Sequence, residues 1–324
     1  MTRPVVLMNR AGFYPPGWVE RNWPKLSGLA EIRRTALESG PELIAEIAEA
    51  DVLYSRNPFL VSREVLAAGA KLRGVVTAAV GYEKVDLEAA SEHGIAVVNS
   101  PGNTASVAEA TILLVLALAK RLPFWTDAAK TGKAVDPSVA FSEALGKTIG
   151  IVGFGRIGRA TAAIARALGM KVLAYGPRLD KSDLAEVASL DELLRRSDYV
   201  SLHASLTPAT HRMIDAGKLA LMQPTAFIVN TARGELIDEA ALVEALRDGR
   251  IAGAGLDVFE VEPPRADNPL LAMPNVIATP HRLAHAVETR RRCAELAEQN
   301  ILALLRGELP EFTVNRDVKW RIAP

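Results

Sequence analysis

Three kinds of side chain that could together support hydride transfer follow apolar runs in the second half of the chain. Arg233 comes shortly after the run AFIV, and His281 follows the run NVIA in the segment Thr-Pro-His. Two carboxylates, Glu260 and Glu262, follow the run IAGAGL. If these runs are parallel strands of one sheet, their carboxyl ends meet at the same edge. The spacing therefore predicts one site that combines a guanidinium, a carboxylate and an imidazole.

Each of these groups has a task in the reduction of a ketone. The carbonyl oxygen needs a proton donor, and histidine titrates near pH ~6.5. A carboxylate hydrogen-bonded to the imidazole orients the ring and favours its protonated form. A guanidinium binds a substrate carboxylate and polarises the adjacent carbonyl group. Beside a nicotinamide, such a set of residues would form a hydride-transfer site.

A glycine-rich turn in residues 148–169 could bind that nicotinamide cofactor. Its sequence, TIGIVGFGRIGRATAAIARALG, closes an apolar strand, has the GxGxxG spacing and opens an alanine-rich amphipathic helix. This context is what the dinucleotide fingerprint requires. The first glycine permits the tight turn, the second lets the pyrophosphate approach the backbone, and the third lets the helix pack on the strand. The phosphates would lie at the positive end of the helix. The residues predicted to bind them are Gly153, Gly155, Arg156, Ile157 and Gly158.

The residue after the next strand bears on the choice between NAD and NADP. An acidic residue there would hydrogen-bond the ribose 2′-hydroxyl of NAD. The chain has Gly176 at this position, followed by Arg178 and Lys181. Glycine cannot repel a 2′-phosphate, and the two cations could pair with one. The sequence therefore favours NADP, with NAD possible; the alternative is that Arg178 is a solvated loop residue.

Composition limits the class of protein. The chain has 324 residues, more than the roughly 250–300 at which a single core stops growing, so we expect two domains. Lys+Arg and Asp+Glu are equal at 38 each, which removes the electrostatic case for a nucleic-acid or membrane partner. The single cysteine excludes an intrachain disulfide and a cysteine-cluster metal site, and no metal is expected. The longest apolar stretch is too short to span a bilayer and no secretory signal is present, so we expect a cytoplasmic protein.

Short β-branched runs alternate with helical patterns along the chain, which predicts the α/β class with parallel sheets. One series of strands is expected at residues 5–8, 52–55, 74–78 and 96–99. A second is expected at residues 148–153, 171–175, 199–203, 226–230, 251–257 and 276–279. The residues after 286 add a helix but no strand series, so we expect them to return to the first domain. The predicted fold is thus two Rossmann-like or flavodoxin-like domains, with the dinucleotide-binding domain inserted into the other.

The helix expected at residues 104–121 is apolar nearly all round and needs a partner surface. We therefore expect a homodimer, although the partner surface could also belong to the same chain.

Several long motifs carry a resemblance that covers nearly the whole chain. They are VGYEKVDLEAASEHGIAVVNSPG, VAEAT, VGFGRIGR, SLHASLTPATHRMI, NTARGELIDEAALVEAL, AGLDVFEVEPP and TPH. With them the chain closely resembles the D-isomer-specific 2-hydroxyacid dehydrogenase family, which includes phosphoglycerate dehydrogenase and glyoxylate/hydroxypyruvate reductase. The resemblance implies hydride transfer between NAD(P)H and a small 2-keto acid to give the D-2-hydroxy acid, with a glyoxylate/hydroxypyruvate-type reductase favoured.

The resemblance also implies roles for the catalytic residues. Arg233 is implied to bind the substrate, His281 to be the acid/base, and Glu262, the residue directly before the proline, to be its partner. From the two strand series we expect residues 1–100 with 286–324 to form the substrate domain and residues 101–285 the dinucleotide-binding domain. The resemblance implies that the two close over the ligand.

Further residues are expected around the cofactor and the substrate. Asp257 is implied to contact the nicotinamide carboxamide, and backbone amides near Val80 and Gly81 to hold the substrate carboxylate. Arg56 is a candidate for the substrate side. On the cofactor side we expect His203, as a packing residue rather than an acid, together with Ala204, Thr231, Ala232, Arg233 and His281.

The chain departs from the family pattern near the expected substrate position. Thr77-Ala78-Ala79 stands where many members have Arg-x-Gly, Glu83-Lys84 replaces a frequent Asp-Asn, and Leu283-Ala284 replaces the usual Gly-Ser. These changes leave the identity of the substrate open, and the missing basic residue at Thr77 weakens the case for a phosphorylated one.

Two other functions remain as alternatives. One is oxidation of a small anion such as phosphite on the same fold; formate is disfavoured because formate enzymes of this superfamily have Gln where Glu262 stands. The other is a nicotinamide-sensing binding protein with vestigial catalysis. Turnover of a panel of 2-keto acids would separate these possibilities.

Overall fold

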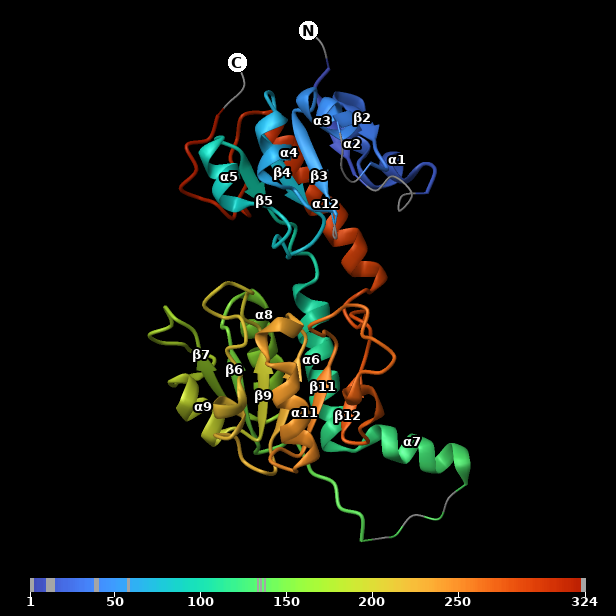
Figure 1. Cartoon of the computed structure of the whole chain (residues 1–324), viewed down its shortest axis with the longest axis vertical. Coiled ribbons are helices and arrows are strands. Elements are labelled where there is room, and N and C mark those ends of the chain that lie inside the picture. Colours follow the sequence, from blue (N-terminus) through green and yellow to red (C-terminus); the bar gives the residue numbers. More distant parts are fainter. Residues whose placement is uncertain are drawn as a thin grey trace. The chain divides into compact units, whose positions relative to one another are not determined.

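The computed structural model describes residues 3–9, 15–37, 41–56, 59–132, 134, 136 and 138–321. Strands and helices alternate along the chain, and all strand pairs of both sheets are parallel, so the predicted α/β class with two parallel sheets is confirmed (Figure 1). The chain divides into two compact units. Unit 1 comprises Met1–Asn103 and Ala286–Pro324, and unit 2 comprises Thr104–His285.

Unit 1 contains a five-stranded parallel sheet with the order β2-β1-β3-β4-β5. Four of its strands consist of buried residues, as expected for a sheet covered on both faces. The edge strand β2, with the sequence EIRR, was not predicted, because its charged side chains hide the apolar pattern of a strand. The strands are β1 (Val5–Met8), β2 (Glu31–Arg34), β3 (Val52–Ser55), β4 (Gly74–Thr77) and β5 (Ala96–Val98).

Helices cover both faces of this sheet. Alternate residues of β1 separate the two layers. Val6 packs in one cluster with Trp23, the N-cap residue of α2, and with Ile301 of α12, whereas Leu7 packs in another with Leu43 of α3. The C-terminal segment therefore completes one layer of the core of unit 1. The helices are α1 (Trp18–Asn22), α2 (Pro24–Leu29), α3 (Pro41–Ala48), α4 (Arg63–Ala68), α5 (Leu87–Glu92) and α12 (Val287–Leu305).

Unit 2 contains a seven-stranded parallel sheet with the order β12-β11-β10-β9-β6-β7-β8. The chain runs outward from β6 in one direction and then returns to β9, on the other side of β6, so the strand order reverses there. In open parallel sheets, ligands bind at the carboxyl ends of the strands at such a reversal. The strands are β6 (Thr148–Val152), β7 (Lys171–Tyr175), β8 (Glu186–Val187), β9 (Tyr199–Leu202), β10 (Phe227–Asn230), β11 (Gly253–Leu256) and β12 (Val276–Ala278).

The helices of unit 2 also lie on both faces of its sheet. Apolar residues of α6 and α8 share one buried cluster with β6, and those of α9, α10 and α11 share another with β9 and β10. The helices are α6 (Thr104–Ala119), α7 (Leu122–Thr131), α8 (Arg156–Ala167), α9 (Leu190–Arg196), α10 (Ala216–Leu219) and α11 (Glu239–Arg247), with short 3₁₀ turns η2 (Gly234–Leu236) and η3 (Pro269–Ala272).

The apolar helix α6 finds most of its partner surface in its own unit. It packs against α8, β10 and β11, and most of its residues are buried. Leu113 is an exception, with 51% of its surface exposed. The periodicity left open whether the partner of this helix is intrachain; within unit 2 it largely is. No helix in the described part of the chain combines the length and apolar character needed to cross a membrane.

Candidate active site

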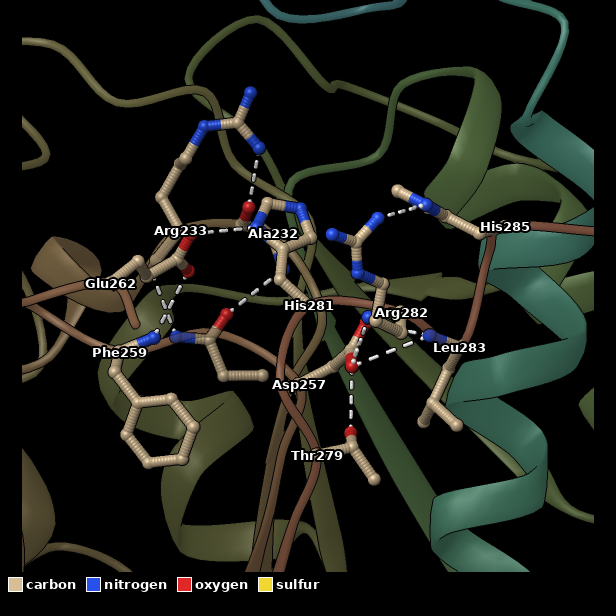
Figure 2. A network of polar contacts seen from close by, with 11 residues as sticks. Ala232, Arg233, Asp257, Phe259, Glu262, Thr279, His281, Arg282, Leu283 and His285 are labelled. Atoms are coloured by element: carbon tan, nitrogen blue, oxygen red, sulfur yellow. Dashed lines mark hydrogen bonds and ion pairs between the residues drawn. The ribbon is translucent and has the colours of Figure 1, made fainter. Parts of the chain in front are cut away.

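His281 and Glu262 meet at the carboxyl edge of the unit 2 sheet. Their loops follow β12 and β11, which are adjacent strands. Nδ1 of His281 lies 2.8 Å from Oε2 of Glu262 (Figure 2). The other carboxylate oxygen, Oε1, accepts a hydrogen bond from the backbone N–H of Phe259 at 3.3 Å. Because one oxygen is held by its own loop and the other by the imidazole, the carboxylate fixes the orientation of the ring.

Arg233 belongs to the same group of charges. Burial raises the pKa of the Glu262 carboxyl, but the hydrogen bond and charge of His281, the Phe259 amide and the charge of Arg233 outweigh it, so the pKa lies below its usual value. Glu262 is therefore ionised at neutral pH. The structure thus brings together the guanidinium, carboxylate and imidazole that the sequence predicted to converge. With Nδ1 engaged by the carboxylate, Nε2 is the atom of His281 that remains for proton transfer.

The turn that carries Arg233 is held by Asn230, a residue that the sequence analysis did not single out. Its side-chain oxygen accepts from the Ala232 N–H at 3.0 Å, and its Nδ2 donates to the Arg233 carbonyl at 2.8 Å. The neighbouring Thr231 is buried and its hydroxyl lies 2.9 Å from that of Thr111 on α6. These contacts fix the backbone from which the guanidinium extends.

Glu260, the second carboxylate of the segment, has different partners. Its Oε1 lies 3.1 Å from Nε of Arg212, and its backbone N–H donates to Glu239 at 3.1 Å. Of the two glutamates, only Glu262 contacts the imidazole in the described structure. Glu260 helps to hold the loop on which Glu262 lies.

Asp257 anchors the loop of His281 from both sides. Its buried carboxylate accepts from the Thr279 hydroxyl at 2.6 Å, from the Arg282 N–H at 3.0 Å and from the Leu283 N–H at 3.3 Å (Figure 2). His281 lies between these donors with a φ of 54°, in the left-handed region that residues other than glycine seldom adopt. The carboxylate therefore stabilises an unusual backbone conformation at the imidazole. The expected contact of Asp257 with the nicotinamide stays a prediction.

The glycine-rich turn between β6 and α8 fits a dinucleotide phosphate. Gly153 has a φ of 95°, and a Cβ there would lie 2.5 Å from the Ala204 nitrogen; a Cβ on Gly158 would lie 2.3 Å from the Gly153 oxygen. The packing of the chain itself therefore requires these two glycines. Around Gly155, apart from its two neighbours in the chain, no atom of the described residues lies within 4 Å of the Cβ position. Open space beside the N-cap residue of α8, where backbone N–H groups are available, suits a pyrophosphate.

The end of β7 presents no carboxylate. Gly176 follows the strand directly, and Arg178 and Lys181 are both exposed in the loop after it. The loop thus carries two cations that could pair with a 2′-phosphate, together with the exposed carboxylates of Asp180 and Asp183.

His203 follows β9, beside the glycine-rich turn. Its Nε2 lies 2.9 Å from the hydroxyl of the buried Ser201, and its backbone N–H donates to the Val152 carbonyl at 2.7 Å. Burial lowers the pKa of His203 to about 4. The imidazole is therefore neutral at physiological pH and is a poor proton donor there.

Three residues predicted for the substrate side, Arg56, Val80 and Gly81, belong to unit 1. Arg56 follows β3, and its backbone N–H donates to Asn9 at 2.9 Å. Val80 and Gly81 lie in the loop after β4, where Asn99 donates to the Val80 carbonyl at 3.0 Å. The hydroxyl of Thr77, the last residue of β4, donates to the Ala79 carbonyl at 2.9 Å, so Thr77 shapes the start of this loop.

Comparison with known proteins agrees with this description. Residues 112–282 match the profile of the D-isomer specific 2-hydroxyacid dehydrogenase, NAD binding domain. A D-3-phosphoglycerate dehydrogenase of Methanocaldococcus jannaschii is 44% identical over 281 residues, which are 85% of this chain and 53% of that protein. The chain thus matches only about half the length of that relative.

Other similar proteins are matched over most of their length. A glyoxylate reductase of Korarchaeum cryptofilum is 41% identical over 285 residues, 85% of this chain and 86% of that one. The crystal structure of a glyoxylate reductase from Paecilomyes thermophila superposes with a TM-score of 0.86 at 30% identity, covering 97% of this chain and 99% of that one. On these matches, the chain belongs to the D-isomer-specific 2-hydroxyacid dehydrogenase family.

Proposed function

We propose that the protein is a nicotinamide-dependent reductase that converts a small 2-keto acid into the D-2-hydroxy acid. The observation that supports this most directly is the hydrogen bond between His281 Nδ1 and Glu262 Oε2, with the charge of Arg233 acting on the same carboxylate. The relatives named glyoxylate reductase point to glyoxylate as the substrate to test first.

The reaction assigns one task to each side chain. Arg233 binds the carboxylate of the keto acid and polarises the adjacent carbonyl group. A reduced nicotinamide held at the glycine-rich turn between β6 and α8 would supply the hydride for the carbonyl carbon. Nε2 of the protonated His281 delivers a proton to the carbonyl oxygen, and Glu262 stabilises and orients the charged ring. In the reverse direction the neutral imidazole accepts the hydroxyl proton.

A substrate panel tests this function. Purified protein is assayed with glyoxylate, hydroxypyruvate, pyruvate and bulkier keto acids, each with NADH and NADPH, and the configuration of the product is determined. Phosphite and formate are included as oxidisable anions. We expect reduction of keto acids to D products; turnover of phosphite alone would reject the proposal, and so would the absence of any turnover.

The proton donor is tested by His281→Ala. General acid catalysis contributes roughly 10²- to 10⁴-fold, so kcat should fall by that factor while cofactor binding is retained. The exposed His211 provides a matched control, since His211→Ala should keep the rate of the parent protein. Undiminished turnover in the His281 variant would reject this role.

We also propose that NADPH is preferred over NADH. The preference rests on Gly176, which offers no carboxylate to repel a 2′-phosphate, and on the exposed Arg178 and Lys181. Gly176→Asp should therefore weaken NADPH binding and improve NADH binding, as measured by fluorescence titration of both cofactors. Equal affinity of the parent protein for the two cofactors would reject the preference.

A homodimer through the region of α6 and α7 is a further proposal. Figure 1 shows α7 leading away from the sheet of unit 2. Leu122, Phe124, Phe141 and Leu145 are exposed in this region, and Trp125 contacts both Phe124 and Phe141 edge-on. Sedimentation of the protein and of Phe124→Asp tests the proposal, which a monomeric parent protein would reject. Residence in the cytoplasm stays a prediction.

A further inference from the structure

Arg282, the residue directly after His281, carries a positive charge that no carboxylate of the described chain neutralises. No acidic residue lies near Arg282 in the sequence, since residues 268–287 contain neither Asp nor Glu. The contact of its guanidinium in the described structure is with an imidazole: Nη1 lies 2.9 Å from Nδ1 of His285. Other arginines of unit 2, such as Arg196, Arg212 and Arg265, form ion pairs with carboxylates.

The backbone of Arg282 is fixed although its side chain is exposed. Its N–H donates to the buried carboxylate of Asp257 at 3.0 Å, in the same network that holds His281. Figure 2 shows the side chains of Arg233, His281 and Arg282 extending to the same side of this network, away from Thr279. The guanidinium of Arg282 thus lies on the same side of the network as His281, the proposed proton donor.

The contact with His285 has a defined donor and acceptor. A guanidinium can only donate, so Nδ1 of His285 is the acceptor. The acceptor is an imidazole nitrogen and carries no negative charge. His285 orients the guanidinium without cancelling its charge, which a carboxylate in the same place would do.

The carboxylates of the site are engaged elsewhere. Glu262 accepts from His281 and from the Phe259 N–H, and Asp257 accepts from Thr279 and from two backbone N–H groups. The single carboxylate of a simple 2-keto acid is bound by Arg233 in the proposed function. The charge of Arg282 is therefore in excess of what a monoanionic substrate requires.

We propose that Arg282, oriented by His285, binds a second anionic group on the substrate, so that the enzyme prefers 2-keto acids with a carboxylate or phosphate at the far end of the side chain. This inference rests on the proposed function and adds the substrate class to it. Arg282 is then a specificity-determining residue. Glyoxylate has no side chain and therefore no second anionic group for Arg282 to bind.

Matched pairs of substrates test the proposal. 2-Oxoglutarate and 2-oxopentanoate differ in the distal carboxylate, and 3-phosphohydroxypyruvate and hydroxypyruvate differ in the phosphate. Because a hydrogen bond to a charged group contributes about tenfold or more, kcat/KM should favour the dianionic member of at least one pair by about that factor. The pair with the larger ratio identifies the anion as carboxylate or phosphate.

Three variants assign the preference to this residue. Arg282→Met should reduce the dianion-to-monoanion ratio to about one, and Arg282→Lys, which keeps the charge but loses the fork of donors, should retain part of it. Arg265→Met is the control, because Arg265 is exposed and pairs with Asp267; its ratio should equal that of the parent protein. Circular dichroism and cofactor titration of each variant establish that it is folded.

The outcomes separate the inference from the function on which it rests. Ratios near one for both pairs in the parent protein, with normal turnover of keto acids, would overturn the inference and leave the proposed function standing. The same conclusion follows if folded Arg282→Met slows both members of a pair equally. Absence of turnover with every keto acid would overturn both.

Discussion

Gly234 packs directly against the peptide that joins Phe259 to Glu260. A Cβ at Gly234 would lie 1.9 Å from the carbonyl carbon of Phe259 and 2.3 Å from the nitrogen of Glu260. Gly234 follows Arg233, and the contacted peptide begins the loop that carries Glu262. The two loops therefore approach each other through a position that tolerates no side chain, and this approach sets the separation of the guanidinium from the carboxylate.

Gly234→Ala should damage stability and activity together. The added methyl group meets backbone atoms, which cannot rotate away, so the two loops must separate. We expect the free energy of unfolding to fall by at least about 2 kcal/mol and kcat/KM to fall by about 100-fold, as for a misplaced catalytic group. Thermal unfolding and steady-state kinetics measure the two effects.

A matched control is Gly28→Ala in α2, where the Cβ would meet nothing within 4 Å among the described residues outside its own helix backbone. Alanine favours a helix over glycine by roughly 0.5–1 kcal/mol, so this variant should be unchanged or slightly more stable. If Gly234→Ala has the melting temperature and kcat/KM of the parent protein, the two loops do not depend on this close contact.

Glu262→Gln should slow reduction. The amide keeps a similar shape but removes the negative charge that faces the imidazole, so the protonated ring loses its partner. We expect kcat to fall roughly 100-fold. Glu260→Gln, which removes the charge that pairs with Arg212 and leaves Glu262 in place, should lower kcat far less. Equal losses of kcat in the two variants would contradict the assignment of the partner.

Thr279→Val should affect the position of His281 without touching the reacting groups. The variant removes the hydroxyl that donates to Asp257 at 2.6 Å and so loosens the carboxylate that holds the loop. A hydrogen bond to a charged group contributes about 1.5–3 kcal/mol, so kcat should fall about tenfold or more while the Kd of the cofactor stays within about twofold. Thr279→Ser retains the hydroxyl and should restore most of the rate; failure of this rescue would argue against the hydrogen bond.

His203 should make the protein less stable in acid. Above its unfolded pKa of 6.5 the residue is neutral in both the folded and the unfolded chain. Below that pH the unfolded chain takes up a proton, whereas the folded protein does so only near its depressed pKa of about 4. The free energy of unfolding therefore falls as the pH is lowered through this window, by up to about 3 kcal/mol in total.

Urea unfolding of the parent protein and His203→Gln between pH 7 and pH 4 measures this term. The stability difference between the two proteins should change by about 3 kcal/mol across the window in favour of the variant. His211→Gln at an exposed position should follow the parent protein at every pH. Parallel curves for His203→Gln would show that burial does not set the titration of this residue.

The sequence predicted the main features of the fold because buried parallel strands and glycine turns have strong local patterns. The strands after which Arg233, Glu262 and His281 lie were expected from apolar runs, and the sheet edge then brings the three together. The edge strand β2 escaped prediction, since its charged residues do not alternate with apolar ones, and the two-residue strand β8 is too short to have a period.

The contacts that support the site could not be predicted, because they join residues far apart in the chain. Nothing local distinguishes Asp257 as the anchor of the loop after β12, or Gly234 as a contact of Phe259. The choice of Glu262 over Glu260 came from the family pattern, whereas the contact with Arg212 that occupies Glu260 appears only in the folded chain. The depressed pKa of His203 likewise depends on burial, which composition does not reveal.

The two segments that make up unit 1 have a consequence for synthesis on the ribosome. The indole N–H of Trp23 donates to the carbonyl of Ala294, and the side-chain oxygen of Asn315 accepts from the Val97 N–H at 2.8 Å. The amino-terminal sheet therefore lacks part of its hydrophobic layer until the last helix has been translated. Unit 2 is one continuous stretch that can fold before α12 is synthesised. During that time the apolar residues of unit 1 that α12 later covers stay exposed.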